Sequence, residues 1–226
     1  MPGTPFFSWP GKFVQDFLGP QRLKALFIPY AAVTLPFDEY ALLVGKAFDN
    51  LGYSLTSIHL TKNPEQAVRD AEVIVIGGGN SFALLTQLYQ NNLVGLIKDK
   101  IKDGTQYIGW SAGANVACPT IMTTNDMPIT YPPSFDAIDG VPFQINPHYT
   151  DFKQAGHGGE TRQQRIEEFL VMNSNRKVIG LPEGMLLQRE QNNLSLKGEG
   201  QAVLFQYGNE PKKLTPGSDI NFLMDS

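Results

Sequence analysis

The chain of 226 residues is poor in the side chains that most often build disulfides and zinc sites. It has one cysteine, Cys118, and three histidines. A single thiol cannot form an intramolecular disulfide, and the common structural zinc sites, which use two to four cysteine ligands, need further cysteines. Any reaction step that needs an imidazole must therefore use His59, His148 or His157.

The chain also lacks a strong charge of one sign and a long apolar run. Lys and Arg total 18 against 22 Asp and Glu, which gives a net charge of −4. Without a basic stripe to bind phosphates, nucleic acid is not an expected partner. Residues 1–5 have neither the basic nor the apolar region of a signal peptide, and no run approaches the length of a membrane span. We therefore expect a cytoplasmic protein with no membrane partner.

What the chain does contain is enough apolar material for a sizeable core. Hydrophobic residues make up 42% and charged residues 18%, a balance that excludes disorder as the main state. The length favours one domain. Because no internal repeat and no linker divides the sequence, we expect residues 1–226 to form a single domain.

Short apolar runs alternate with amphipathic stretches along most of the chain. Strands are predicted at residues 23–28, 53–60, 72–76, 106–109 and 177–181, and helices at 38–51, 63–68, 81–89, 93–102 and 160–172. Such alternation predicts an α/β fold, with a mostly parallel sheet and helices on both faces. From Met185 onward, short runs separated by Asn and Gly turns predict antiparallel strands at one edge.

A Gly-x-Ser-x-Gly pattern, residues 109–113, follows one of these strands directly. Its glycines permit a sharp strand-to-helix turn that exposes the serine, so Ser111 is a candidate nucleophile. The alternative is a glycine-lined turn with a bystander serine. Cys118 is a rival in principle, but no cationic neighbour lowers its pKa, and we expect a buried thiol.

A serine nucleophile needs a base, and the base needs an orienting group. We favour His148, because it follows a short strand and Pro147 stiffens its approach, whereas His157 stands among glycines. Glu183 follows another buried strand and is the expected orienting carboxylate. The alternative for His148 is a loop histidine exposed to solvent, and the alternative for Glu183 is a turn residue without a catalytic role. Four other carboxylates compete with Glu183 for the orienting role. These are Asp126, Asp136, Asp139 and Glu160.

The segment Gly77-Gly78-Gly79-Asn80 follows a predicted buried strand. Three glycines let backbone N–H groups approach a ligand closely, which suits an oxyanion hole. No Gly-Lys-Ser/Thr follows, so the segment is not a P-loop, and Phe82 occupies the last glycine's place in a dinucleotide-binding motif. A tight strand-to-helix turn is the simpler alternative.

Five ordered motifs resemble the peptidase E family of α-aspartyl dipeptidases, over about residues 2–203. They are 77–80 (GGGN), 109–115 (GWSAGAN), 123–128 (TTNDMP), 145–148 (INPH) and 181–184 (LPEG). The resemblance implies a flavodoxin-like fold related to class I glutamine amidotransferases. It also implies hydrolysis of short peptides with an N-terminal aspartate, without metal or cofactor.

The same resemblance implies roles for particular residues. Ser111, His148 and Glu183 match the catalytic triad, and Gly79 with Ala112 matches the oxyanion hole.

Residues 159–166 also match the family, and a guanidinium suits bidentate binding of a substrate carboxylate. We expect Arg162 first and Arg165 second in this role, unless either only braces its helix. Asp126 is a candidate for the substrate α-amine, and Asn80 is a further candidate contact.

One departure from the resemblance concerns the start of the chain. Family members begin with a short apolar strand before the segment that matches Met1-Pro2-Gly3, and that strand is absent here. Either the start lies upstream or the sheet lacks one strand. Loss of a strand would lower the stability of the fold, whereas the motifs that carry the chemistry are still present.

For the oligomeric state, we expect a monomer or a homodimer.

Three rival functions remain open. One is a cyanophycinase-like peptidase that cleaves β-aspartyl links, also through Ser111. Another is an α/β-hydrolase esterase, disfavoured because that fold orders its triad as Ser, Asp or Glu, then His. The last is an inactive module that binds acidic peptides.

Overall fold

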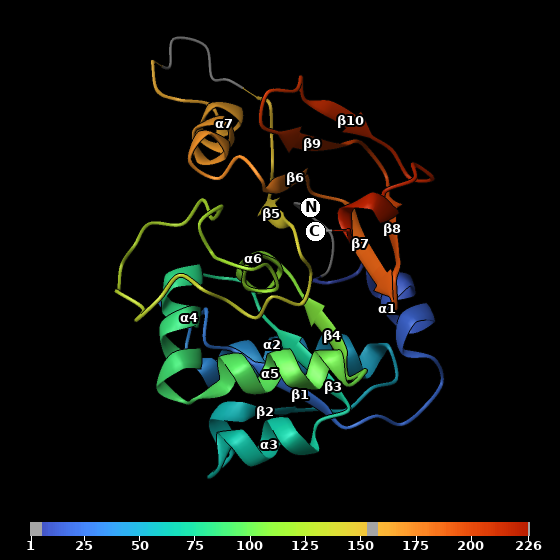
Figure 1. Ribbon diagram of the computed structural model, residues 1–226. Helices are drawn as coiled ribbons and strands as arrows, with labels where there is room; N and C mark the ends of the chain where they lie inside the picture. Colours follow the sequence, from blue (N-terminus) through green and yellow to red (C-terminus); the bar gives the residue numbers. More distant parts are fainter. Residues whose placement is uncertain (1–5, 153–157, 226) are drawn as a thin grey trace.

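The computed structural model describes residues 6–152 and 158–225 (Figure 1). Its strands form two four-stranded sheets and one hairpin. In the first sheet, all four strands are parallel, in the order β2-β1-β3-β4. These strands are β1 (Ala25–Ile28), β2 (Leu55–Ser57), β3 (Val73–Ile76) and β4 (Gln106–Gly109).

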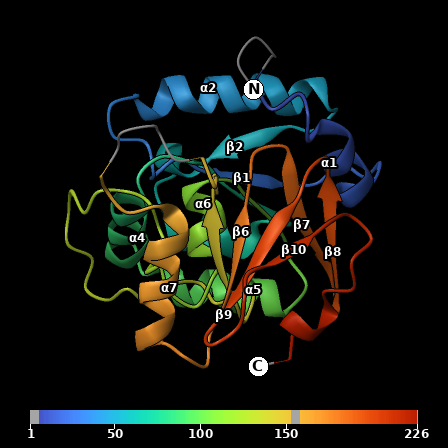
Figure 2. The ribbon, with the colours of Figure 1, turned by 90° about the horizontal axis from the view of Figure 1, so that it is seen from above.

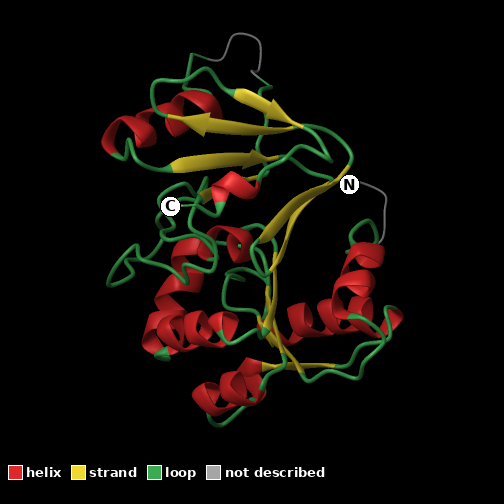
Figure 3. Ribbon diagram, turned by 45° about the vertical axis from the view of Figure 1, so that its right-hand side comes forward, coloured by secondary structure: helices red, strands yellow, loops and turns green. Residues whose placement is uncertain are grey.

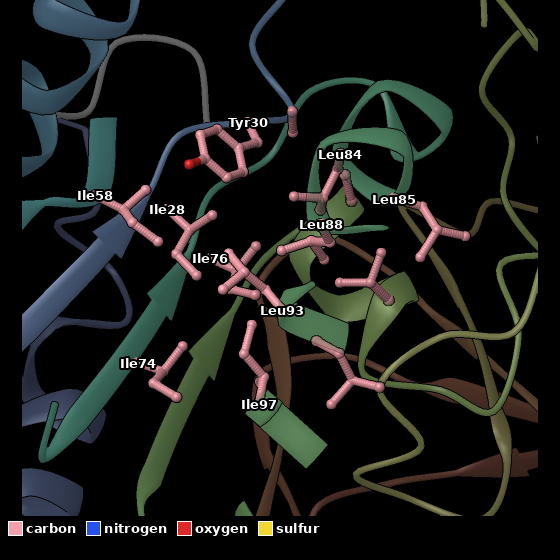
Figure 4. Close-up of a cluster of buried hydrophobic side chains, with 14 of the residues drawn as sticks. Ile28, Tyr30, Ile58, Ile74, Ile76, Leu84, Leu85, Leu88, Leu93 and Ile97 are labelled. Atoms are coloured by element: carbon pink, nitrogen blue, oxygen red, sulfur yellow. The ribbon is translucent and has the colours of Figure 1, made fainter. Parts of the chain in front are cut away.

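Helices cover both faces of the first sheet. Strands β1 and β3 are buried along their whole length, as expected where both faces of a parallel sheet are covered. Side chains from alternate strand positions pack into two separate apolar clusters, one on each face. One face is covered by α1 (Gly11–Leu18) and α2 (Phe37–Asn50), and the other by α3 (Pro64–Asp70), α4 (Ser81–Gln90) and α5 (Leu93–Lys102). Figure 4 shows the cluster of the second face, to which Ile74 and Ile76 of β3 and the leucines of α4 belong.

The second sheet combines parallel and antiparallel pairing, in the order β10-β9-β6-β5. Its strands are β5 (Gln144–Pro147), β6 (Lys177–Leu181), β9 (Ala202–Gln206) and β10 (Lys212–Leu214), and only β5 and β6 are parallel. Helix α7 (Arg162–Met172) packs Ile166 and Leu170 against this sheet (Figure 2). Strands β7 (Met185–Glu190) and β8 (Asn193–Gly198) form the hairpin. Figure 3 shows the two sheets as separate groups of strands.

This architecture confirms the predicted class, a parallel α/β sheet with helices on both faces and antiparallel strands toward the C-terminus. One predicted strand is shorter than expected. Over 53–60 only Leu55–Ser57 is extended, because the chain turns at Ile58–Leu60, where Thr61 N donates to Ile58 O. The single domain and the missing first strand stay predictions. In the described ranges, no helix is both long and apolar enough to cross a membrane.

Candidate active site

The carboxyl ends of two parallel strand pairs, β3–β4 and β5–β6, lie at one rim of the molecule. Ser111 comes just after β4, and His148 follows β5 directly. Both side chains line a cavity of about 290 Å³. Seven further residues complete its wall: Ser81, Ala112, Thr124, Asn125, Asp126, Pro147 and Arg162. The strand-end positions singled out in the sequence therefore do come together.

Ser111 lies on a sharp turn between β4 and the short helix α6 (Ala112–Val116). Its backbone has φ 53° and ψ −115°, an unusual conformation for a residue with a side chain. The flanking glycines are required, because a Cβ at Gly113 would lie 2.2 Å from Ile76 O and one at Gly109 would lie 2.5 Å from Gly113 O. The geometry is that of a turn built to expose a serine.

His148 is held in place by a hydrogen bond of its ring and by a backbone hydrogen bond of the next residue. Its Nδ1 is hydrogen-bonded to Glu183 Oε1, across the strand pair β5–β6. The next residue, Tyr149, donates its N–H to Leu181 O at 3.0 Å. With Nδ1 occupied by Glu183, Nε2 is the ring nitrogen left for chemistry. The imidazole is 47% exposed and the carboxylate 65% exposed, so the pair sits at the surface of the cleft.

No hydrogen bond joins Ser111 to His148 in the described part of the chain, although both line the same cavity. In free enzymes such contacts are often long and tighten only when substrate binds.

The glycine segment after β3 packs directly behind the serine turn. A Cβ at Gly78 would lie 2.9 Å from the Cβ of Ser111. Gly79 has φ +141°, and a Cβ there would lie 2.1 Å from Ala31 O. Only glycine can adopt this backbone conformation so close to Ala31. The glycines therefore allow the backbone of this segment to lie beside Ser111. Ala112, the other predicted oxyanion donor, lines the cavity itself.

Asn80, a predicted substrate contact, is placed differently. Its Oδ1 accepts from the N–H groups of Phe82 and Ala83, as an N-cap of α4, and its Nδ2 donates to Met127 O at 2.9 Å. Both polar ends are occupied, and Asn80 is not among the residues of the cavity wall. The structure therefore uses this residue to hold the loop that contains Asp126.

Asp126 does reach the cavity. Its Oδ2 accepts from Ser81 N at 2.7 Å, at the first residue of α4. Its own N–H donates to Thr124 Oγ1, and that hydroxyl donates to Ser81 Oγ at 3.1 Å. One carboxylate oxygen is thus anchored, which fixes an anion on the wall of the cavity.

The two candidate arginines separate in the structure. Arg162 lines the cavity, and its Nη1 donates to Pro147 O at 3.2 Å. Burial, with a smaller contribution from the charge of Arg165, lowers the pKa of Arg162, but an arginine stays a cation. Arg165 is exposed and lies 3.7 Å from Glu160 Oε2, outside the cavity wall. Arg162 and Asp126 therefore supply one cation and one anion to the same small cavity.

The remaining candidates lie away from this cavity wall or outside the described residues. His59 is bonded to Asp38 and Ser57, and Asp139 pairs with Lys98 at 2.7 Å. Asp136 and Glu160 do not line the cavity either, and His157 falls in the undescribed segment 153–157. The Cys118 thiol is buried, which raises its pKa to about 12. Such a thiol is inert as a nucleophile.

Four residues of the cavity wall were not predicted as site residues: Ser81, Thr124, Asn125 and Pro147. Ser81 and Thr124 join Asp126 in one hydrogen-bonded group, and Asn125 donates to Pro147 O at 3.0 Å. The run Thr123–Pro128, one of the five ordered motifs, was the available signal for Thr124 and Asn125. Among the described residues, no group of three or more His, Cys, Asp or Glu side chains is arranged to hold a metal ion.

Comparisons with known proteins agree on one family. The profile of Peptidase family S51 matches residues 4–197. A protein named Peptidase E from Nostoc sp. is 44% identical over 99% of this chain and 92% of its own length. Peptidase E from Haemophilus influenzae is 51% identical over 77% of this chain and 81% of its own. A solved putative peptidase E from Listeria monocytogenes shares the fold, with a TM-score of 0.66 at 24% identity, over 87% of this chain and 96% of that one.

Proposed function

The chain belongs to peptidase family S51, and we propose that it is a serine-type dipeptidase that releases N-terminal aspartate from dipeptides and similar short substrates. The single observation that carries the proposal is the cavity of about 290 Å³ with Ser111, His148, Arg162 and Asp126 on its wall. This volume is at the small end for ligand pockets, which suits one amino-acid residue.

In the proposed reaction, Ser111 Oγ attacks the carbonyl carbon of the aspartyl residue while His148 Nε2 accepts the hydroxyl proton. Glu183, bonded to Nδ1, holds the ring and favours its protonated form. His148 then donates the proton to the departing amine. Water attacks the resulting acyl-enzyme by the same steps in reverse, which frees aspartate and restores Ser111.

The N–H groups of Gly79 and Ala112 are the proposed donors to the oxyanion. Gly79 adjoins Gly78, which packs against Ser111, and Ala112 follows the serine in the chain. A preorganised donor of this kind contributes about 3–4 kcal/mol to the stability of a transition state.

The charges of the cavity account for the proposed specificity. An N-terminal aspartate presents a side-chain carboxylate and a free α-amine, which are the groups that Arg162 and Asp126 complement. A planar guanidinium binds the carboxylate of a substrate aspartate with two parallel hydrogen bonds. The side-chain amide of an asparagine in the same place has one acceptor oxygen and cannot accept both. Arg165 lies beside Glu160, outside the cavity wall, and has no role in binding the substrate carboxylate in this proposal.

The proposal is tested by release of leucine from Asp-Leu, Asn-Leu, Glu-Leu, Ala-Leu and isoAsp-Leu. We expect Asp-Leu to be cleaved far faster than the other four dipeptides. The Asp-Leu rate should fall below about 1% in Ser111→Ala, because no other group replaces the nucleophile. Preference for isoAsp-Leu would instead establish the β-aspartyl peptidase. Calorimetric binding of aspartate by folded protein without any turnover would establish the binding module.

A further inference from the structure

The wall of the small cavity includes a carboxamide that the proposed reaction does not use, that of Asn125. Asn125 directly precedes Asp126 in the loop between α6 and β5, and its side chain is half-buried. One end of a carboxamide donates hydrogen bonds and the other end accepts them. What Asn125 offers to a ligand therefore depends on which of its two ends is already engaged.

The hydrogen bonds around Asn125 fix the direction of its amide. Its Oδ1 accepts from Asn146 Nδ2 at 2.9 Å, and the same nitrogen donates to Thr123 O at 2.9 Å. Asn146 is 3% exposed, and its own Oδ1 has no partner among the described residues. Asn146 therefore acts here as a donor only, and a reversed Asn125 would bring two amide nitrogens together. The nitrogen of Asn125 is thus the end left for a ligand.

The nitrogen of Asn125 lies beside the guanidinium of Arg162. Asn125 Nδ2 donates to Pro147 O at 3.0 Å, and Arg162 Nη1 donates to the same oxygen at 3.2 Å. Because both donors share one acceptor, a neutral N–H group stands next to the cation of the cavity. Nδ2 carries two hydrogens, and the described residues provide an acceptor for one of them. The second hydrogen is available to a group that Arg162 also binds.

A carboxylate held by Arg162 has capacity for this second donor. Its two oxygens offer about four lone-pair sites, and a guanidinium that binds with two parallel hydrogen bonds occupies two of them. A hydrogen bond to a charged acceptor is about twice as strong as one between neutral groups. Because Asn125 is uncharged, it adds this contact without neutralising Asp126, the proposed partner of the α-amine.

We propose that Asn125 is a specificity-determining residue, which donates its second Nδ2 hydrogen to the side-chain carboxylate of the substrate aspartate beside Arg162. Asn146 fixes the direction of that donor. The inference rests on the proposed function, since it assigns one more contact within the same pocket. The contact forms in the bound substrate as well as in the transition state, so its loss raises KM more than it lowers kcat.

The test compares Asn125→Ala, Asn125→Asp and Asn115→Ala. The first change removes the donor, and the second keeps the size of the side chain but places a carboxylate there. Asn115→Ala is the matched control, because Asn115 is a buried amide that also bonds to Thr123 but does not line the cavity. Tm is measured for each variant, with kcat and KM for Asp-Leu and kcat/KM for Ala-Leu, which has no side-chain acceptor.

We expect Asn125→Ala to lower kcat/KM for Asp-Leu about tenfold, mainly through KM, and to leave the value for Ala-Leu within about twofold. Asn125→Asp should lower the Asp-Leu value further, because an anion in this place repels the substrate carboxylate. Asn115→Ala should leave the ratio of the two values unchanged even where Tm falls. Either variant of Asn125 carries the test if the other does not fold.

An unchanged ratio of Asp-Leu to Ala-Leu in the Asn125 variants would overturn the inference. An equal fall for both dipeptides would also overturn it, since Asn125 would then act only on the shape of the site. In both cases the proposed function stands, because the unaltered chain still prefers Asp-Leu. If the unaltered chain shows no such preference, the proposed function fails and the role of Asn125 fails with it.

Discussion

Arg162 gives the sharpest test of the proposed specificity, because Arg165 in the same helix serves as its matched control. We predict that Arg162→Met lowers kcat/KM for Asp-Leu by about 30- to 150-fold and that Arg165→Met leaves it within about twofold. The physical difference is position. Arg162 lines the cavity, whereas Arg165 is exposed beside Glu160, in a type of pair that contributes little.

The magnitude follows from the partial burial of Arg162. Removing one partner of a buried, hydrogen-bonded charge pair costs about 2–5 kcal/mol. Because Arg162 is only half-buried, the lower end applies, about 2–3 kcal/mol, which corresponds to about 30- to 150-fold.

Little of this loss should come from misfolding. Pro147 O keeps a second donor, Asn125 Nδ2 at 3.0 Å, when the guanidinium is removed. The capping box of α7 also stays, since it is formed by Thr161 and Gln164. We therefore expect Tm of Arg162→Met to lie close to that of the unaltered chain.

The assay is the initial rate of leucine release from Asp-Leu, Asn-Leu and Ala-Leu for the unaltered chain and both variants. In Arg162→Met the preference for Asp-Leu over Asn-Leu should collapse, because the cation that distinguishes the two is gone. The reasoning is refuted if Arg162→Met keeps its Asp-Leu rate, or if Arg165→Met loses as much. An equal fall for all three dipeptides would also refute it, since that would indicate a general defect.

Three further predictions follow from single contacts. Glu183→Gln should lower kcat at least about tenfold with little change in KM, because a neutral amide cannot stabilise the protonated imidazole; an unchanged kcat would exclude an orienting role. Gly79→Ala should lower Tm by several degrees, because the added Cβ would clash with Ala31 O. Gly45→Ala should not lower Tm, because a Cβ at Gly45 has open space around it. Equal Tm values for the two variants would contradict the described conformation of the loop at Gly79. Cys118 should resist iodoacetamide at pH 9 until the chain is unfolded, because burial raises its pKa to about 12 and keeps the thiolate scarce; rapid labelling of the folded chain would show that the thiol is accessible.

Local sequence patterns were sufficient for most of the fold. Helical spacing over 38–51, 81–89 and 93–102 predicted α2, α4 and α5 to within a residue or so, because these helices each bury one apolar stripe. The apolar run at 72–76 predicted a strand buried on both faces, and β3 is one. The pattern failed at 53–60, where apolar alternation continued but the backbone turned at Ile58.

Each candidate site residue was predictable only from the pattern around it, and no pattern showed which of these residues meet in space. Gly-x-Ser-x-Gly marked Ser111, and Pro147 before His148 indicated a fixed histidine. Helical spacing alone did not distinguish Arg162 from Arg165, which are three residues apart on one helix, and only the structure shows that Arg162 reaches the cavity while Arg165 lies beside Glu160. Nor did any pattern show that Asn80 also holds the loop of Asp126, because the acceptor of its Nδ2, Met127 O, lies 47 residues away.

The sequence by itself determined which segments become strands and helices and which residues stand at the strand ends, because propensity and hydrophobic period act over a few neighbouring residues. The tertiary structure alone decided what those ends face. His148 meets Glu183 because β5 and β6 pair in the register that places Pro147 opposite Leu181. Arg162 and Asp126 meet in one cavity because α7 and the loop before β5 converge on the same rim.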